Sequence, residues 1–383
     1  MKRKIAVVTV ARSDYGLLQP ILDEILKTEN LELQLIVAAA HLSPRFGTTI
    51  NQIKSDGYPI AATVEMTQDQ DDPNSISLAT AKGIEGFSQT YQTLKPDLLI
   101  LLGDRYEMFA AGVASVPHLI PIAHIHGGEE TTGAIDNVYR HALTKMSHIH
   151  FASTELHAQR IIQMGENPNN VHISGAPGID RILNTPTPPL EELQAQITSL
   201  KQPYIIATFH PVTTEPSEAK QQALNFLNAL KNQPQQTLLT MPNADTGGLA
   251  VREAIKEIQP EFPNLIAVEN LGSTYLTAME HAEFMAGNSS SGIIEAASFN
   301  LPVVNIGNRQ QGRAQSGNVI NCGTNQSEIE EALTLANSKH AKDIARATTN
   351  IYGNGNSARF IVTTLTKINY SPNMLIKSFI SKQ

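Results

Sequence analysis

The chain has 383 residues, of which 41% are hydrophobic and 17% charged, and its formal net charge is −8. This composition is typical of a folded globular protein and excludes a disordered chain, and the acidic charge disfavours a nucleic-acid-binding protein. The single cysteine, Cys322, excludes an internal disulfide, the first apolar stretch is too short for a secretory signal, and no apolar run reaches the ~20 residues of a membrane span, so we expect a cytoplasmic protein with no membrane partner.

In the first half of the chain, short apolar runs alternate with helical patterns. The runs that predict strands are KIAVVTV (4–10), LELQLIVAAA (31–40), DLLILLG (97–103), IPIAHI (120–125) and HIHFAS (148–153). Helical patterns lie between them, for example at 17–26, 106–116 and 137–146. Because the strands are almost continuously apolar, this alternation is typical of a parallel sheet that is covered by helices on both faces.

A proline-rich, polar stretch at 184–203 interrupts this rhythm and predicts a passage between domains. Further predicted strands follow, at 204–209, 236–242, 264–268, 283–288 and 301–307. We therefore predict an α/β fold of two doubly wound Rossmann-like domains, 1–183 and 184–360, that face each other across a ligand-binding cleft. The last segment, 361–383, is predicted to be a C-terminal helix that packs back on the first domain.

Polar clusters follow five of the predicted strands, at 11–16, 103–107, 126–136, 210–214 and 287–292. Any one of them is explained equally well by the ordinary polarity of turns. In an open parallel sheet, however, ligands bind beyond the carboxyl ends of the strands. Five such clusters, drawn from both halves of the chain, therefore predict a ligand site.

The most informative cluster is GNSSSGIIE (287–295), which leads from a predicted strand into a helix. Free backbone N–H groups and serine hydroxyls at such a position suit a phosphate, and Glu295 suits a ribose diol, although an ordinary serine N-cap explains the stretch equally well. Arginines near strand ends are candidate ligands of a diphosphate, and these are Arg12, Arg105, Arg309 and Arg313.

Carboxylates and histidines gather in the same clusters. Asp104, Glu129 and Asp136 come from two adjacent strand ends of the first half, and His210 comes from the second half. A carboxylate whose pKa is raised by partial burial can act as a general acid or base. The alternative interpretation is structural: Asp104 would pair with a neighbour such as Arg105, and His210 would cap a turn.

Cofactor and metal motifs are weak or absent from the sequence. There is no GxGxxG and no GxxxxGK[ST], so nicotinamide and ATP cofactors are not expected. A zinc site of His124, His126 and His210 is possible in principle, but no cysteine or supporting pattern accompanies it. We therefore expect neither a cofactor nor a metal.

In order along the chain, several segments resemble the hydrolysing UDP-N-acetylglucosamine 2-epimerases and their relatives of the sialic-acid and legionaminic-acid pathways. The segments are RSDYG (12–16), GDRYE (103–107), HIHGGE (124–129), GAPGID (175–180), HPVTT (210–214), GNSSSG (287–292) and GNRQQGR (307–313). Each is weak alone, but the ordered series is specific. The resemblance covers most of the chain and implies the GT-B architecture, a UDP-sugar substrate and no metal or nicotinamide.

The resemblance also implies roles for residues. The positions that match catalytic ones are Asp104, Glu129, Asp136 and His210, and those that match UDP-contacting ones are Arg12, Arg105, Ser289, Ser290, Glu295 and Arg309. Some relatives carry a glutamate where this chain has His126. Which of His126 and Glu129 acts as the acid or base therefore stays open.

The implied reaction converts UDP-N-acetylglucosamine to UDP and free N-acetylmannosamine, by anti elimination of UDP and hydration of a 2-acetamidoglycal. The alternative substrate is UDP-2,4-diacetamido-2,4,6-trideoxyglucose, of the legionaminic-acid pathway. Two other classes are a GT-B glycosyltransferase and a non-catalytic nucleotide-sugar sensor, and the acidic cluster disfavours both. We also expect a homo-oligomer, either a dimer or a tetramer.

Overall fold

The computed structural model of the chain describes residues 2–44, 47–67, 72–130, 135–212, 217–242, 248–370 and 372–380. The chain divides into two compact units. The first contains the chain up to Glu129, Ile135–Arg181 and the chain from Tyr352 onward, and the second is built on Ile182–Ile351. The domain bounds predicted from the sequence lie at 183/184 and 360/361, whereas the two units divide at 181/182 and 351/352.

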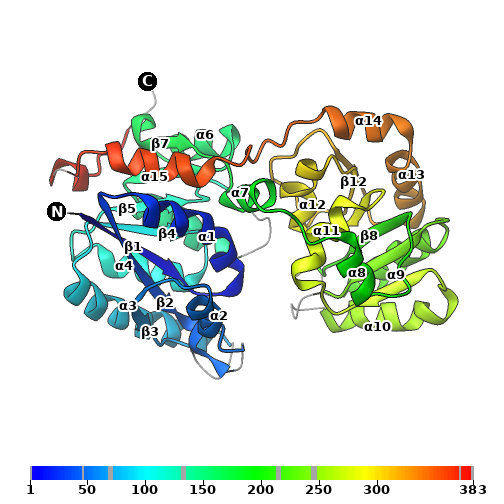
Figure 1. The fold of residues 1–383 in the computed structure, drawn as a ribbon, viewed down its shortest axis with the longest axis horizontal. Helices are drawn as coiled ribbons and strands as arrows, with labels where there is room; N and C mark the ends of the chain where they lie inside the picture. Colours follow the sequence, from blue (N-terminus) through cyan, green and yellow to red (C-terminus); the bar gives the residue numbers. More distant parts are fainter. Residues whose placement is uncertain are drawn as a thin grey trace. The chain divides into compact units, whose positions relative to one another are not determined.

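The first unit contains a parallel seven-stranded sheet with the order β3-β2-β1-β4-β5-β6-β7 (Figure 1). Its strands are β1 (Arg3–Thr9), β2 (Leu31–Ala38), β3 (Ile60–Val64), β4 (Leu98–Leu102), β5 (Ile122–Ile125), β6 (Ile149–Ala152) and β7 (Val171–Ile173). Strand order reverses at β1, which pairs with both β2 and β4. The carboxyl ends of β1, β4 and β5 therefore lie side by side, where ligands bind in doubly wound folds.

Helices cover both faces of this sheet. Its helices are α1 (Arg12–Lys27), α2 (Ile50–Ser55), α3 (Pro73–Leu94), α4 (Tyr106–Ser115), α5 (Asp136–Met146), α6 (Glu155–Gln163), α7 (Pro177–Asn184) and α15 (Ser357–Lys367). Alternate strand residues serve the two faces, since Ile5 and Val7 pack with α1, α2 and α15, while Ala6 and Val8 pack with α3, α4 and α5. The strands are apolar throughout because both faces are buried.

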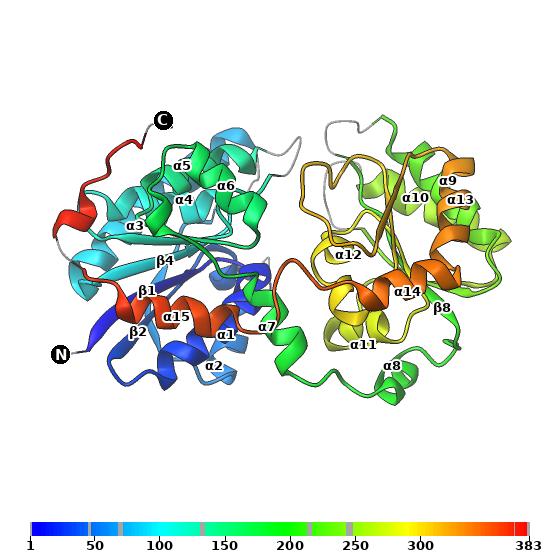
Figure 2. The same cartoon turned by 90° about the horizontal axis from the view of Figure 1, so that it is seen from above.

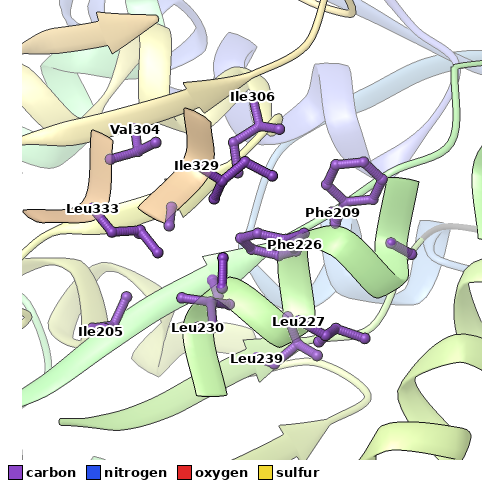
Figure 3. Packing of buried hydrophobic residues seen from close by; sticks show 14 of the residues in the cluster. Ile205, Phe209, Phe226, Leu227, Leu230, Leu239, Val304, Ile306, Ile329 and Leu333 are labelled. Carbon is purple, nitrogen blue, oxygen red and sulfur yellow. The ribbon is translucent and has the colours of Figure 1, made fainter. Parts of the chain in front are cut away.

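The second unit repeats this architecture with a six-stranded parallel sheet of order β10-β9-β8-β11-β12-β13. Its strands are β8 (Tyr204–Thr208), β9 (Gln236–Thr240), β10 (Leu265–Val268), β11 (Met285–Gly287), β12 (Val303–Ile306) and β13 (Val319–Cys322). Its helices are α8 (Leu190–Gln196), α9 (Ala219–Lys231), α10 (Gly248–Ile258), α11 (Tyr275–Glu280), α12 (Ser290–Ile294), α13 (Gln326–Ala336) and α14 (Lys339–Ala347). Figure 3 shows the core where Phe226 of α9 and Ile329 of α13 pack over the sheet.

Helix α15 returns to the first unit and lies beside α1 (Figure 2). Its N-terminus is capped by the buried carboxylate of Asp180, which accepts the backbone N–H groups of Ser357 at 2.9 Å and Ala358 at 2.6 Å. Near its other end, Arg3 donates to the carbonyl oxygen of Thr366 at 3.2 Å. The last helix of the chain is thus part of the first unit's core.

Within the described part of the chain, every helix is too short or too polar to cross a membrane.

Candidate active site

The loop after β5 brings His126 and Glu129 together in the first unit. Nδ1 of His126 lies 2.5 Å from Oε1 of Glu129, and both side chains are buried. His126 has a φ of +65° and Gly128 a φ of +74°. A Cβ on Gly128 would lie 2.3 Å from the carbonyl oxygen of His157, so only glycine fits there. Glycine at position 128 therefore allows a tight loop in which the His126 imidazole contacts the Glu129 carboxylate.

Arg140 of α5 joins this pair to Asp104, which follows β4. The buried guanidinium donates to the Asp104 carboxylate, to Oε2 of Glu129 at 3.4 Å and to the carbonyl oxygen of His126 at 3.3 Å. Charge-assisted contacts of this kind are strong when they are withdrawn from water. Asp104 does not use Arg105, because that guanidinium is bound to Glu107 at 2.7 and 3.1 Å.

Asp136 is the first residue of α5 and lies close to the same cluster. Partial burial raises its pKa, and the neighbouring Asp104 carboxylate raises it further. A raised pKa makes a carboxyl group better suited to act as a general acid than an ordinary aspartate. The first unit thus gathers four of the sequence-predicted catalytic residues, and Arg140 is the member that sequence analysis missed.

Arg12 and Arg105 lie at neighbouring strand ends of the first unit. Arg12 begins α1 and is exposed, and Arg105 precedes α4. In the first turn of α1, the buried Asp14 accepts hydrogen bonds from Thr9 Oγ1 at 2.6 Å and from the N–H of Ala11 at 2.7 Å. Burial raises the pKa of Asp14 to about 6. Asp14 therefore closes the turn that presents Arg12.

In the second unit, Asn288 fastens His210 to the end of β11. The buried Asn288 side chain accepts the backbone N–H of His210 at 2.7 Å and donates to its carbonyl oxygen at 2.8 Å. Burial, and then the charge of Arg309, lower the pKa of His210 to about 4, so the imidazole is neutral at neutral pH. Thr213 and Thr214 of the same motif lie outside the described residues, as do residues 131–134 of the polar cluster 126–136.

Ser289, Ser290 and Ser291, which we call the serine cluster, follow Asn288 at the same strand end. Ser289 caps α12, and its Oγ accepts the N–H of Ser291 at 3.4 Å. Arg309 donates to the carbonyl oxygen of Asn288 at 3.0 Å. Ser289, Ser290 and Arg309 are thereby gathered beside His210.

The two remaining UDP-site candidates of the second unit lie in the adjoining turns. Glu295 ends the short helix α12, directly after Ile294. Arg313 lies in the turn after β12, where its backbone N–H donates to the carbonyl oxygen of Gln310 at 3.2 Å.

Across the residues that the structure describes, no three or more histidine, cysteine, aspartate or glutamate side chains are arranged to hold a metal ion. His124 uses both ring nitrogens within the first unit, with Nε2 at 2.8 Å from the carbonyl oxygen of Gly103 and Nδ1 at 3.2 Å from Oγ1 of Thr144. Burial lowers its pKa to about 3, so the ring is neutral and structural.

The sequence and the fold both match known proteins. A sequence model of the family described as UDP-N-acetylglucosamine 2-epimerase matches residues 23–366. The UDP-N,N'-diacetylbacillosamine 2-epimerase (hydrolyzing) of Legionella pneumophila is 35% identical over 364 residues, which cover 94% of each chain. The GDP/UDP-N,N'-diacetylbacillosamine 2-epimerase (hydrolyzing) of Campylobacter jejuni is 34% identical over 345 residues, which cover 89% of each chain.

Among solved structures, the UDP-GlcNAc 2-epimerase of Neisseria meningitidis bound to UDP-GlcNAc superposes with a TM-score of 0.82 at 20% identity, over 95% of this chain and 100% of that one. At this identity the likeness shows the fold, which is of the GT-B type. Together with the family match over most of the sequence, it leads to one conclusion: the chain is an enzyme of the UDP-N-acetylglucosamine 2-epimerase family.

Proposed function

We propose that the enzyme is a hydrolysing 2-epimerase that releases UDP from a UDP-2-acetamido sugar and inverts carbon 2 of the sugar. The observation that carries this proposal is the cluster of the buried His126, Glu129 and Arg140 with the partly exposed Asp104, and with Asp136 beside it. A histidine–carboxylate pair supplies a proton acceptor, and a carboxyl group of raised pKa supplies a proton donor. Both are needed for elimination followed by hydration.

In the proposed reaction, a base removes the proton from C2 while the C1–O bond to UDP breaks. UDP leaves with the bonding electrons, and a C1=C2 double bond forms in the sugar ring. Water then adds its hydroxyl group to C1, and a proton is delivered to the opposite face of C2. Because the C2 proton is not acidic, stabilisation of the departing diphosphate must lower much of the barrier.

We assign the stabilisation of UDP to the serine cluster and Arg309 of the second unit, and include Glu295 and Arg313 as further contacts of the nucleotide. Hydroxyl groups, backbone N–H groups and a guanidinium at one strand end suit a diphosphate. Arg12 and Arg105 are the candidate cations of the first unit. His210 is proposed to take part in the chemistry as a neutral imidazole.

Ser290→Ala and Arg309→Ala are expected to lower kcat/KM by about 10²–10³-fold, because each removes a donor to the departing diphosphate, an effect of ~2.7–4 kcal/mol. Steady-state kinetics with a coupled assay for UDP would measure this. Arg252→Ala is the matched control, since that arginine pairs with Glu269 at an exposed position and should leave kcat/KM unchanged. Wild-type kcat/KM in either site variant would remove that residue from the UDP site.

For the sugar, we propose UDP-2,4-diacetamido-2,4,6-trideoxyglucose as the preferred substrate and UDP-N-acetylglucosamine as the second candidate. The Legionella relative, at 35% identity, carries the first substrate in its name as UDP-N,N'-diacetylbacillosamine, and the Campylobacter relative, at 34% identity, is named for GDP/UDP-N,N'-diacetylbacillosamine. A UDP-N-acetylglucosamine 2-epimerase of Neisseria meningitidis serogroup B is 32% identical over 335 residues, which keeps UDP-N-acetylglucosamine as the second candidate. We expect kcat/KM to be at least about tenfold higher for the diacetamido sugar, which corresponds to ~1.4 kcal/mol.

The decisive experiment follows both UDP-sugars by NMR during incubation in D₂O without an acceptor. The expected products are UDP and the free 2-epimerised sugar, with deuterium at C2. Retention of all the original hydrogen at C2 would exclude the elimination route. Turnover only after an acceptor is added would indicate a glycosyltransferase, and binding without turnover would indicate a nucleotide-sugar sensor.

A further inference from the structure

We propose that Ser153 and His157 are positioning residues, which form a hydrogen-bond chain to Glu129 and thereby make Nε2 of His126 the atom that exchanges a proton with the sugar. Neither residue belongs to a motif that the sequence singled out. The catalytic part of this inference rests on the proposed function. The proton positions within the chain do not, and they can be tested without substrate.

The chain runs through the interior of the first unit. Ser153 follows β6, and its Oγ lies 2.7 Å from Oε1 of Glu129 and 2.8 Å from Nδ1 of His157 in α6. Ser153 and His157 are 1% and 0% exposed, and Glu129 is 4% exposed. Because the three side chains are buried, the positions of their hydrogens follow from the hydrogen bonds that they make with one another.

Chemistry fixes where those hydrogens lie. Glu129 is held as a carboxylate beside Arg140, so its oxygens only accept hydrogen bonds. Ser153 has one proton, which it donates to Glu129, and its oxygen must therefore accept from Nδ1–H of His157. Burial lowers the pKa of His157 to about 4, which makes this ring neutral at neutral pH and leaves its Nε2 without a proton.

The same argument sets the state of His126. Its Nδ1 donates to the Glu129 carboxylate at 2.5 Å, so in the neutral ring Nε2 carries the lone pair. This nitrogen is buried and has no hydrogen-bond partner among the described residues. Glu129, in contrast, already accepts from His126, Ser153 and Arg140. Glu129 therefore orients the imidazole ring, and Nε2 of His126 acts as the base.

Helix α6 also fastens the backbone of this loop. Arg160 donates to the carbonyl oxygen of Gly128 at 3.3 Å, and the close approach of Gly128 to the His157 backbone seats the loop on the first turn of α6. Ser153, His157 and Arg160 are spaced so that they reach the same loop from one side. The loop is thus held by Arg160 of α6, at Gly128, and by Arg140 of α5, at His126.

The first test is ¹⁵N NMR of histidine-labelled, substrate-free protein, with the His157 signals assigned by comparison with His157→Gln. We expect the neutral Nδ1–H tautomer of His157 in the wild type. In Ser153→Ala, the partner of Nδ1 is gone, and the ring should shift toward the Nε2–H tautomer. A wild-type His157 that is an imidazolium or an Nε2–H tautomer would overturn the inference.

The second test compares Ser153→Ala with the control Ser147→Ala. Ser147 is also fully buried, but its hydroxyl donates to the carbonyl oxygen of Leu143, outside the chain. Ser153→Ala should lower kcat about 10–100-fold, the range for one hydrogen bond to a charged group, while KM changes less than about twofold. Ser147→Ala should retain kcat.

An unchanged kcat in Ser153→Ala, or equal losses in the two variants, would overturn the positioning role. If the wild-type enzyme itself releases no UDP from either UDP-sugar, the proposed function fails, and the NMR result still decides whether the hydrogen-bond chain exists.

Discussion

His126→Ala is expected to fold, bind UDP and lose about 10²–10⁴-fold in kcat, the usual contribution of a general acid or base. The reason is that Nε2 of His126 is the nitrogen left available by the contact between Nδ1 and Glu129. Glu129→Gln should cost less than His126→Ala, because the imidazole stays in place but loses the carboxylate that fixes its tautomer. Steady-state kinetics and UDP-binding calorimetry on both variants would measure these effects.

Added imidazole provides a sharper control for the same variant. If His126 exchanges the proton, a small imidazole that enters the vacated space should restore part of the activity of His126→Ala, and it should have no effect on Glu129→Gln. A larger loss in Glu129→Gln than in His126→Ala, with no rescue by imidazole, would assign the proton transfer to the glutamate instead.

Arg140→Met is expected to lower the free energy of unfolding by about 3–5 kcal/mol and to abolish turnover, because it leaves the carboxylates of Glu129 and Asp104 close together without their shared cation. Glu129 is the more deeply buried of the two, with 6% of its side chain exposed compared with 24% for Asp104. Urea unfolding followed by circular dichroism would measure the loss.

Two further variants test the physical reason for that loss. Adding Asp104→Asn and Glu129→Gln to Arg140→Met should recover part of the stability but none of the activity, because the unpaired charges are then gone. Arg346→Met is the matched control, since Arg346 pairs with Asp343 on the surface and both side chains are more than half exposed. If Arg140→Met were as stable as this control, the cluster would not depend on its buried cation.

The parallel strands were predictable where they lie inside a sheet, because burial on both faces leaves an apolar run in the sequence. The three strands that sequence analysis did not identify, β3, β7 and β13, all lie at sheet edges. Their residues are partly exposed and mixed in polarity, as in VINC (319–322). Such segments resemble loops until their neighbours in the sheet are known.

The candidate site was predictable to the extent that parallel topology gathers strand ends. Asp104 and Glu129 were expected to be close because β4 and β5 are neighbours, and the structure joins them through Arg140. Arg140 itself was missed because a lone arginine in a helix is usually solvated. Its spacing of four residues from Asp136 on one helix face was the available signal.

The supporting residues were beyond the reach of the sequence for a different reason. Ser153 acts on Glu129 from a different strand, and Asn288 acts on His210 across a separation of 78 residues. Neither contact leaves a local pattern, because it depends on which strands become neighbours. The proposed division of roles between His126 and Glu129 likewise rests on their contact in the folded loop, which the sequence does not show.

The position of α15 has a consequence for how the chain folds during its synthesis on the ribosome. The first unit contains this helix from a distant part of the chain, so the face of α1 that α15 covers stays uncovered until residues 357–367 have been made. At typical rates, the ribosome needs roughly 10–30 s to make the intervening second unit. During that interval the apolar face of α1 is exposed on the nascent chain, and we expect chaperones to bind it. The first unit can therefore finish folding only after α15 has been made.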